Sequence, residues 1–280
     1  MRYEKLYKFL LFLGITLGVL TCVLLYCVNI SLIIKTLNEI EGLWAAILII
    51  LIRISLLSVM TFYVFNKWFK QENLYLSDIP HLFGLFLLLL IFGKLVDLFW
   101  NLTYFRFDEE FVLVLLKIRY FIIILEFIPL MYLSIVMLFY SLSLRERFIK
   151  LRDRKYADKL TIRLLIIIAL IEMFAVIMAP NVFILGRILP FILIPSLIVI
   201  IYIFFFAYKH KRLSEVHPLI IAFGFLLYTI SSILRPLIQA MLGESMHALV
   251  MYIIIAEIID LFVFIVIFIG LYLKASYTET

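Results

Sequence analysis

The residues best suited to chemistry in this sequence are charged residues that lie inside long apolar stretches. At the centre of a bilayer each would cost about 2.5 to 3.5 kcal/mol, so they are expected to face one another or water. In membrane helices such residues build ligand sites, ion paths, proton relays or buried pairs. The ten that we predict to form a ligand-binding site are Arg53, Lys94, Asp97, Arg119, Glu126, Glu172, Arg187, Arg235, Glu257 and Asp260, and an eleventh is Lys117.

Helical spacing indicates which of these groups can cooperate within one helix. Lys94 and Asp97 are three residues apart, so they share a helix face and can form an ion pair. Arg119 and Glu126 are seven residues apart, which again places them on one face. Both pairs are therefore expected to be partly neutralised within their own helix.

The last apolar stretch carries two carboxylates, Glu257 and Asp260, and no cation that could neutralise them. Three residues apart, they lie on one stripe of the helix and need partners from other helices. The arginines expected at matching depth are Arg53, Arg187 and Arg235. Alternatively, two carboxylates at one site could hold a sodium ion or share a proton. We favour arginine pairing, because enough arginines lie at the right depth.

The sequence offers little else for catalysis or for metal binding. All four histidines, His81, His210, His217 and His247, lie at or near the ends of apolar stretches, so no zinc site is expected. The chain also has no HExxH, GxSxG or phosphate-binding Walker sequence. We therefore predict no metal and no cofactor, we assign no catalytic residue, and an enzyme is not favoured.

The elements that hold these charges must lie in lipid. Of the 280 residues, 66% are hydrophobic and 16% are charged, whereas about 25% of residues are charged in an ordinary soluble domain. A soluble fold of this size could not hide so much apolar surface from water. This composition excludes a soluble enzyme and a disordered chain. It predicts an all-α polytopic membrane protein that forms a single integral membrane domain over 1–280.

Eight stretches have the roughly 20 apolar residues that a helix needs to cross a bilayer. They are 9–35, 43–66, 80–102, 111–142, 161–179, 182–208, 217–242 and 246–273. Short polar or proline-containing segments separate them, the shortest being Pro180-Asn181. The sequence thus predicts eight transmembrane helices.

Lysine and arginine lie mostly in the segments on one side of the predicted spans. If the N-terminus is cytoplasmic, the inner segments hold seventeen of these residues, and only Lys35 and Arg106 lie outside. Because cytoplasmic loops carry the excess of Lys and Arg, we predict a cell-membrane protein with both termini cytoplasmic. The net charge of +6 is then a topology signal and gives no reason to expect nucleic-acid binding. The largest inner loop, 143–160, is predicted to be either a short interfacial helix on anionic lipid or only a topology signal.

The two halves of the chain, 1–142 and 143–280, resemble each other weakly. The segment 76–82 (LSDIPHL) before the third span matches 213–219 (LSEVHPL) before the seventh. A parallel 4+4 repeat would make equivalent pairs of Arg53 and Arg187, Lys94 and Arg235, and Glu126 and Glu257. Generic helix-capping residues and chance isoleucine runs would also explain the match.

Three functions from different classes fit this pattern. The first is a small-solute transporter or ligand-sensing module with an outward-facing polar cavity, in which arginines bind an anionic ligand. The second is a non-catalytic subunit of a membrane complex, whose ion pairs only hold helices together. The third is an intramembrane enzyme that modifies lipids or glycan carriers. Beyond membrane lipids, the expected partners are a small anionic ligand and, for a sensor, a cytoplasmic protein.

Overall fold

A computed structural model describes residues 2–103, 107–242 and 245–277 of the chain. These residues form α1 (Arg2–Val28), α2 (Ile30–Glu39), α3 (Leu43–Phe69), α4 (Ile79–Thr103), α5 (Glu109–Ser143), the 3-10 helix η2 (Glu146–Arg152), α6 (Arg154–Met178), α7 (Val182–Lys209), α8 (Pro218–Leu242) and α9 (Met246–Tyr272). Arg106, predicted to lie in an outer loop, falls outside the described residues.

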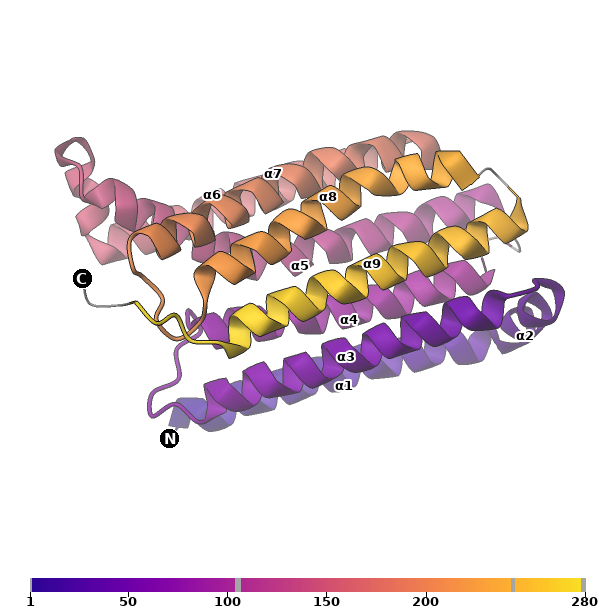
Figure 1. The fold of residues 1–280 in the computed structure, drawn as a ribbon, viewed down its shortest axis with the longest axis horizontal. Coiled ribbons are helices and arrows are strands. Elements are labelled where there is room, and N and C mark those ends of the chain that lie inside the picture. The colour runs from indigo at the N-terminus through magenta and orange to yellow at the C-terminus, as the bar shows by residue number, and fades with distance from the viewer. Residues whose placement is uncertain (1, 104–106, 243–244, 278–280) are drawn as a thin grey trace.

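Eight of these helices are long and apolar enough to cross a membrane, namely α1 and α3 to α9. The predicted fold class, an all-α polytopic membrane protein, is confirmed. The helices run alternately up and down as one bundle, so α1 begins and α9 ends at the same end of the molecule (Figure 1). We call this end the terminal face and the opposite end the far face.

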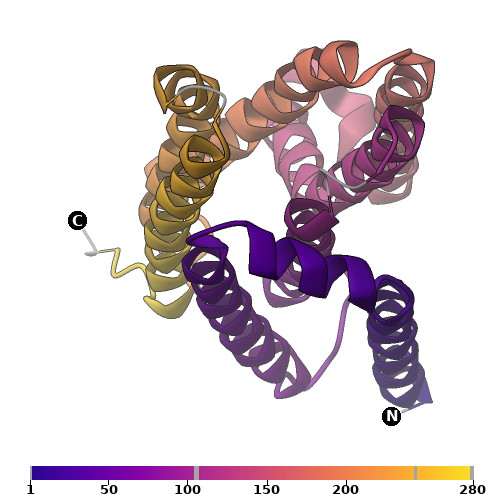
Figure 2. The same cartoon turned by 90° about the vertical axis from the view of Figure 1, so that its right-hand side faces the viewer.

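The first predicted span, 9–35, is divided into two helices in the structure. α1 ends at Val28, and α2 begins at Ile30. Asn29 separates them, and its side-chain Nδ2 donates to the carbonyl of Leu25 at 2.9 Å. α2 has one apolar side, with Ile33 buried, and it lies across the far face between the ends of α1 and α3 (Figure 2). Of these two helices, α1 is long and apolar enough to cross a bilayer, and α2 covers the far face of the bundle (Figure 2).

The segment between the fourth and fifth spans differs from the predicted interfacial helix over 143–160. α5 continues to Ser143, and η2 covers only Glu146–Arg152 before α6 begins at Arg154. α5 has 35 residues, or about 52 Å of helix at ~1.5 Å per residue. The hairpin of α5, η2 and α6 therefore projects beyond the other helices at the terminal face (Figure 1).

The buried apolar side chains of the described residues form three clusters, and the two largest lie at different depths in the bundle. The near cluster lies toward the terminal face and includes Leu57, Met60, Phe83, Phe86, Leu130, Phe225 and Phe264. The far cluster lies toward the far face and includes Ile33, Leu43, Ile50, Phe99, Leu115 and Val250. Between the two clusters, the helices carry the charged residues that the sequence singled out.

Candidate functional site

The two carboxylates of α9 have cationic partners from three other helices. Arg53 Nη1 of α3 lies 2.7 Å from Glu257 Oε2 and 2.5 Å from Asp260 Oδ2. Lys94 Nζ of α4 lies 2.8 Å from Glu257 Oε1. Arg235 Nη2 of α8 donates to Asp260 Oδ2. Of the three predicted arginine partners, Arg53 and Arg235 thus pair with α9.

The same lysine continues the contacts toward α5. Lys94 Nζ lies 3.2 Å from Asp97 Oδ2, which is the expected pair within α4. Arg119 of α5 binds Asp97 in a bidentate manner, with Nε 2.6 Å from Oδ1 and Nη2 3.2 Å from Oδ2. Its Nη1 donates to Glu126 Oε1 at 2.9 Å. A single chain of contacts therefore runs from α5 to α8.

Eight charged residues form this ion-pair chain, in which every link joins opposite charges. In order they are Glu126, Arg119, Asp97, Lys94, Glu257, Arg53, Asp260 and Arg235. Four cations and four anions cancel, so the chain has no net charge. Because each charge lies next to its opposite, the cost of placing eight ions inside a membrane protein is offset locally.

Packing around the chain depends on small and polar neighbours. Gly93 of α4 allows the side chains of Arg119 and Glu126 to lie directly against the helix, because a Cβ there would lie 2.7 Å from Arg119 Nη1. Ser231 of α8 donates to Asp260 Oδ1 at 3.2 Å. The guanidinium of Arg53 lies 5.1 Å from the ring centre of Phe264, a cation–π contact. The missing side chain of Gly93, the hydroxyl of Ser231 and the ring of Phe264 thus complete the surroundings of the ions.

The sequence predicted a polar space open to the outside, and this cavity stays a prediction. Among the described residues, Leu43, Ile50, Phe99 and Val250 of the far cluster are buried between the charges and the far face. α2, which has one apolar side, contributes Ile33 to this cluster.

The ion-pair chain does reach a groove at its Arg235 end. The groove has a volume of about 350 Å³ and lies between α7, α8 and α9. It is lined by Gly186, Leu189, Pro190, Leu193, Ile194, Ser232, Ile233, Arg235, Pro236, Gln239 and Tyr252. The Arg235 side chain is 27% exposed, whereas that of its partner Asp260 is 1% exposed. One end of the chain is therefore open to a ligand from the side of the bundle.

Arg235 also keeps unused hydrogen-bonding capacity. Its Nε is buried and has no hydrogen-bond partner among the described residues. A guanidinium offers five N–H donors in a planar fork, which suits two oxygens of a carboxylate or phosphate. With Nη2 on Asp260 and Nε buried, the exposed part of the guanidinium is the part that faces the groove and could meet a second anion.

Two of the predicted site residues lie outside the ion-pair chain. Glu172 of α6 is half-buried, and no hydrogen bond or ion pair of its side chain is found among the described residues. Arg187 of α7 is exposed, and its guanidinium lies 4.1 Å from the ring centre of Phe183. Lys117 likewise lies apart, and its Nζ donates to the carbonyl of Ile177 at 2.9 Å. Proximity therefore gives no support for including these residues in the same site.

Sequence reasoning missed the pair between Lys94 and Glu257, although a signal for it was present. Lys94 lies nine residues before the end of α4, and Glu257 lies eleven residues after the start of α9. Both ends are at the far face, so the two groups have similar depths. Depth alone does not say which helices are neighbours, and α4 and α9 are distant in sequence.

The described residues contain no group of three or more His, Cys, Asp or Glu side chains that could hold a metal ion. Comparison with models of known protein families, with curated proteins and with solved structures gives no significant match. Functional inference therefore rests on the ion-pair chain and on the groove beside it.

Proposed function

We propose that this membrane protein binds a small solute through a carboxylate or phosphate group, as a transporter or a ligand-sensing module. The binding site is the groove between α7, α8 and α9, and Arg235 is the residue that recognises the anion. The observation that supports this proposal best is that Arg235, at one end of the ion-pair chain, is 27% exposed and lines this groove, whereas Glu126 at the other end is 1% exposed.

The groove has the mixed lining that such a ligand needs. Ser232, Gln239 and Tyr252 supply polar groups around Arg235, while leucine and isoleucine side chains supply apolar contact. Pro190 of α7 and Pro236 of α8 also line it. Each proline removes a backbone donor inside its helix, so a carbonyl oxygen is left free nearby. Interrupted helices next to buried charges are typical of substrate sites in transporters.

Ligand binding at Arg235 would act on the whole ion-pair chain. A bound anion competes with Asp260 for the guanidinium, and Asp260 then depends more strongly on Arg53. Arg53 also holds Glu257, so the change passes to the contacts of α3 and α4. A ligand that prefers one arrangement of these pairs would shift the protein toward it. This coupling would serve both transport and sensing.

Two glycines provide a matched test, because each lines a different groove and a Cβ at either position would meet no atom within 4 Å. Gly186 lines the Arg235 groove, and Gly14 lines a separate groove beside α1. We expect inorganic phosphate or succinate to raise the melting temperature of the purified wild type and of Gly14→Leu, but not of Gly186→Leu. The measurement is a thermal shift in detergent micelles. Equal stabilisation of both variants, or none of the wild type, would contradict the proposal.

A second function is favoured by one specific observation. The ion-pair chain has no net charge, all eight of its side chains are less than 30% exposed, and every link joins partners of opposite sign. We infer that a non-catalytic subunit of a membrane complex, whose charges fix the helix arrangement, is the alternative. In that case Arg235→Lys, which keeps the charge, would preserve both folding and co-purification of partner chains, and phosphate would leave the melting temperature unchanged.

A further inference from the structure

α1 touches the rest of the bundle at three separated points, chiefly along α4. Near the terminal face, the ring of Tyr7 stacks on Trp68 of α3, with the ring centres 6.3 Å apart. In the middle, the Phe92 ring lies against Gly18, where a Cβ would be 2.6 Å from Phe92 Cε1. Near the far face, the Tyr26 hydroxyl donates to the carbonyl of Leu95 at 2.7 Å. The apolar sides of α1 and α4 are thus held apart between these points.

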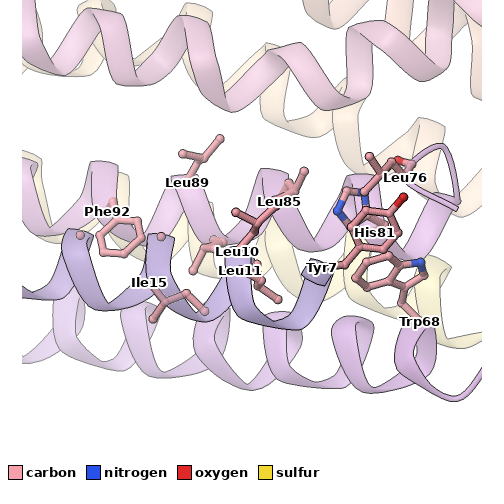
Figure 3. A pocket seen from close by; sticks show the side chains of 13 residues that line it. Tyr7, Leu10, Leu11, Ile15, Trp68, Leu76, His81, Leu85, Leu89 and Phe92 are labelled. Atoms are coloured by element: carbon pink, nitrogen blue, oxygen red, sulfur yellow. The ribbon is translucent and has the colours of Figure 1, made fainter. Parts of the chain in front are cut away.

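Between the first two points lies a groove of about 450 Å³, which we call the α1 groove (Figure 3). Figure 3 shows Tyr7, Trp68 and His81 gathered at one end and Phe92 at the other. The side chains between them are Leu10, Leu11, Ile15, Leu85, Leu88 and Leu89. A space lined in this way, with polar aromatic groups at one end only, matches an amphiphile that enters from the terminal face.

The length of the α1 groove equals about one leaflet. Tyr7 and Gly18 are eleven residues apart on α1, as are His81 and Phe92 on α4. Eleven helical residues span about 16 Å, and half of a ~30 Å hydrocarbon core is about 15 Å. Phe92 therefore closes the groove close to the middle of the bilayer. An acyl chain from the leaflet at the terminal face fits this distance.

Charge at the mouth of the α1 groove selects the headgroup. Lys8 follows Tyr7, and its Nζ lies 5.1 Å from the ring centre of Phe69, the neighbour of Trp68. Lys70 directly follows the last residue of α3 at the same end. The acids closest to this mouth in sequence are Glu4, Glu72 and Asp78, and the Asp78 carboxylate accepts from the backbone N–H of Tyr75 at 3.0 Å. Cations near the surface attract anionic lipids by about 1 kcal/mol each.

We propose that the α1 groove binds one acyl chain of an anionic phospholipid from the leaflet at the terminal face, with its headgroup beside Lys8 and Lys70. The lipid fills the space between α1 and α4 and completes the contact of α1 with the bundle. This site is separate from the groove at Arg235, and the proposal does not depend on the function assigned there.

The test counts phospholipids that stay bound when the protein is taken from bilayers of known composition. Native mass spectrometry would follow extraction from mixtures of phosphatidylglycerol and phosphatidylcholine with identical acyl chains. We expect the wild type and the control Gly186→Leu to retain phosphatidylglycerol. Retention should fall at least tenfold in Gly14→Leu, because the leucine fills the groove. In Lys8→Gln the preference for phosphatidylglycerol over phosphatidylcholine should be reduced. Equal retention by both glycine variants, or no headgroup preference in the wild type, would overturn the proposal.

Fluorescence of Trp68 tests whether a lipid occupies the α1 groove, and it needs no substitution of a residue that lines the groove. Trp68 lines the groove at its terminal-face end, and its side chain is 1% exposed. Trp44, which is 63% exposed, and Trp100 would both be replaced by phenylalanine. Phosphatidylglycerol with brominated acyl chains should then quench Trp68 more strongly than brominated phosphatidylcholine. Equal quenching by the two lipids, or no quenching by either, would overturn the proposal.

Discussion

Each charge within the ion-pair chain has defined neighbours, so the effect of removing one can be argued from its contacts. Glu257 of α9 joins two cations, because it binds Arg53 on one side and Lys94 on the other. Without it, both cations keep only one anionic partner each, Asp260 and Asp97. An excess positive charge would then remain inside the bundle.

The substitution Glu257→Gln should therefore destabilise the protein by about 3 to 5 kcal/mol, the usual loss when one partner of a buried ion pair is removed. The matched control is Glu172→Gln, which also neutralises a glutamate in a membrane span but one that lies outside the chain. Its effect is expected to be within about 1 kcal/mol. The measurement is thermal or denaturant unfolding in detergent. A control that loses as much stability as Glu257→Gln would show that the ion pairs contribute little.

At the residue scale, the sequence predicted those pairs that a single helix can determine. Spacing alone identified Lys94 with Asp97, and Arg119 with Glu126. Depth then selected Arg53 and Arg235 as partners of α9, but it also selected Arg187, which turns toward Phe183 instead. The packing of the folded bundle decides which side of a helix contacts another helix. The spacing and depth of residues in the sequence do not predict that contact.

At the element scale, α8 and α9 approach each other closely at two glycines. A Cβ on Gly224 would lie 3.2 Å from the backbone N of Ile267, and one on Gly270 would lie 2.9 Å from the backbone N of Ile221. The carbonyl of Gly270 also accepts from the backbone N–H of His217 at 2.8 Å. Backbone atoms cannot move aside as a side chain can, so this contact requires glycine.

We expect Gly270→Ala to force α8 and α9 apart and to cost about 1 to 3 kcal/mol, as overpacking usually does. Gly14→Ala is the control, because its added methyl group meets no atom within 4 Å. That variant should be unchanged or slightly stabilised by the higher helix propensity of alanine. Melting temperatures of the two purified variants would check this. A larger loss for Gly14→Ala than for Gly270→Ala would contradict the packing argument.

The helices themselves were largely predictable, since apolar length alone gives eight spans. The turn at Pro180-Asn181 was also predicted correctly: α6 ends at Met178, and the Asn181 side chain accepts from the backbone N–H of Ile184 at 2.9 Å. The break at Asn29 was not predicted, because the apolar run continues through it. α2 turns away from α1 so that Ile33 is buried on the bundle. The surface that buries Ile33 exists only after folding, so the sequence does not show it.

At the scale of the whole molecule, the eight candidate spans bring the start of α1 and the end of α9 to one face (Figure 1). The Lys and Arg distribution predicts that this face is cytoplasmic. The 4+4 repeat also stays a prediction. Of its proposed pairs, Lys94 and Arg235 both belong to the ion-pair chain, whereas Arg187, the counterpart of Arg53, lies outside it.

Cysteine labelling can test the orientation. With Cys22 and Cys27 replaced by serine, a cysteine at Arg147 in η2 should react with an impermeant maleimide only after the cells are opened. A cysteine at Asn38 in α2 should react in intact cells. The measurement is the labelled fraction in each preparation. The reverse pattern would place the terminal face outside and would contradict the predicted topology.

The extra length of α5 has a practical consequence. A bilayer with its headgroups is about 40 to 45 Å thick, so a 35-residue helix leaves its last turns in water when the rest is embedded. The tip of that hairpin, with Arg145, Arg147 and Lys150 on or beside η2, is rich in trypsin cleavage sites. A brief digestion should therefore cut the chain there first and yield two fragments of similar mass that remain associated within the membrane.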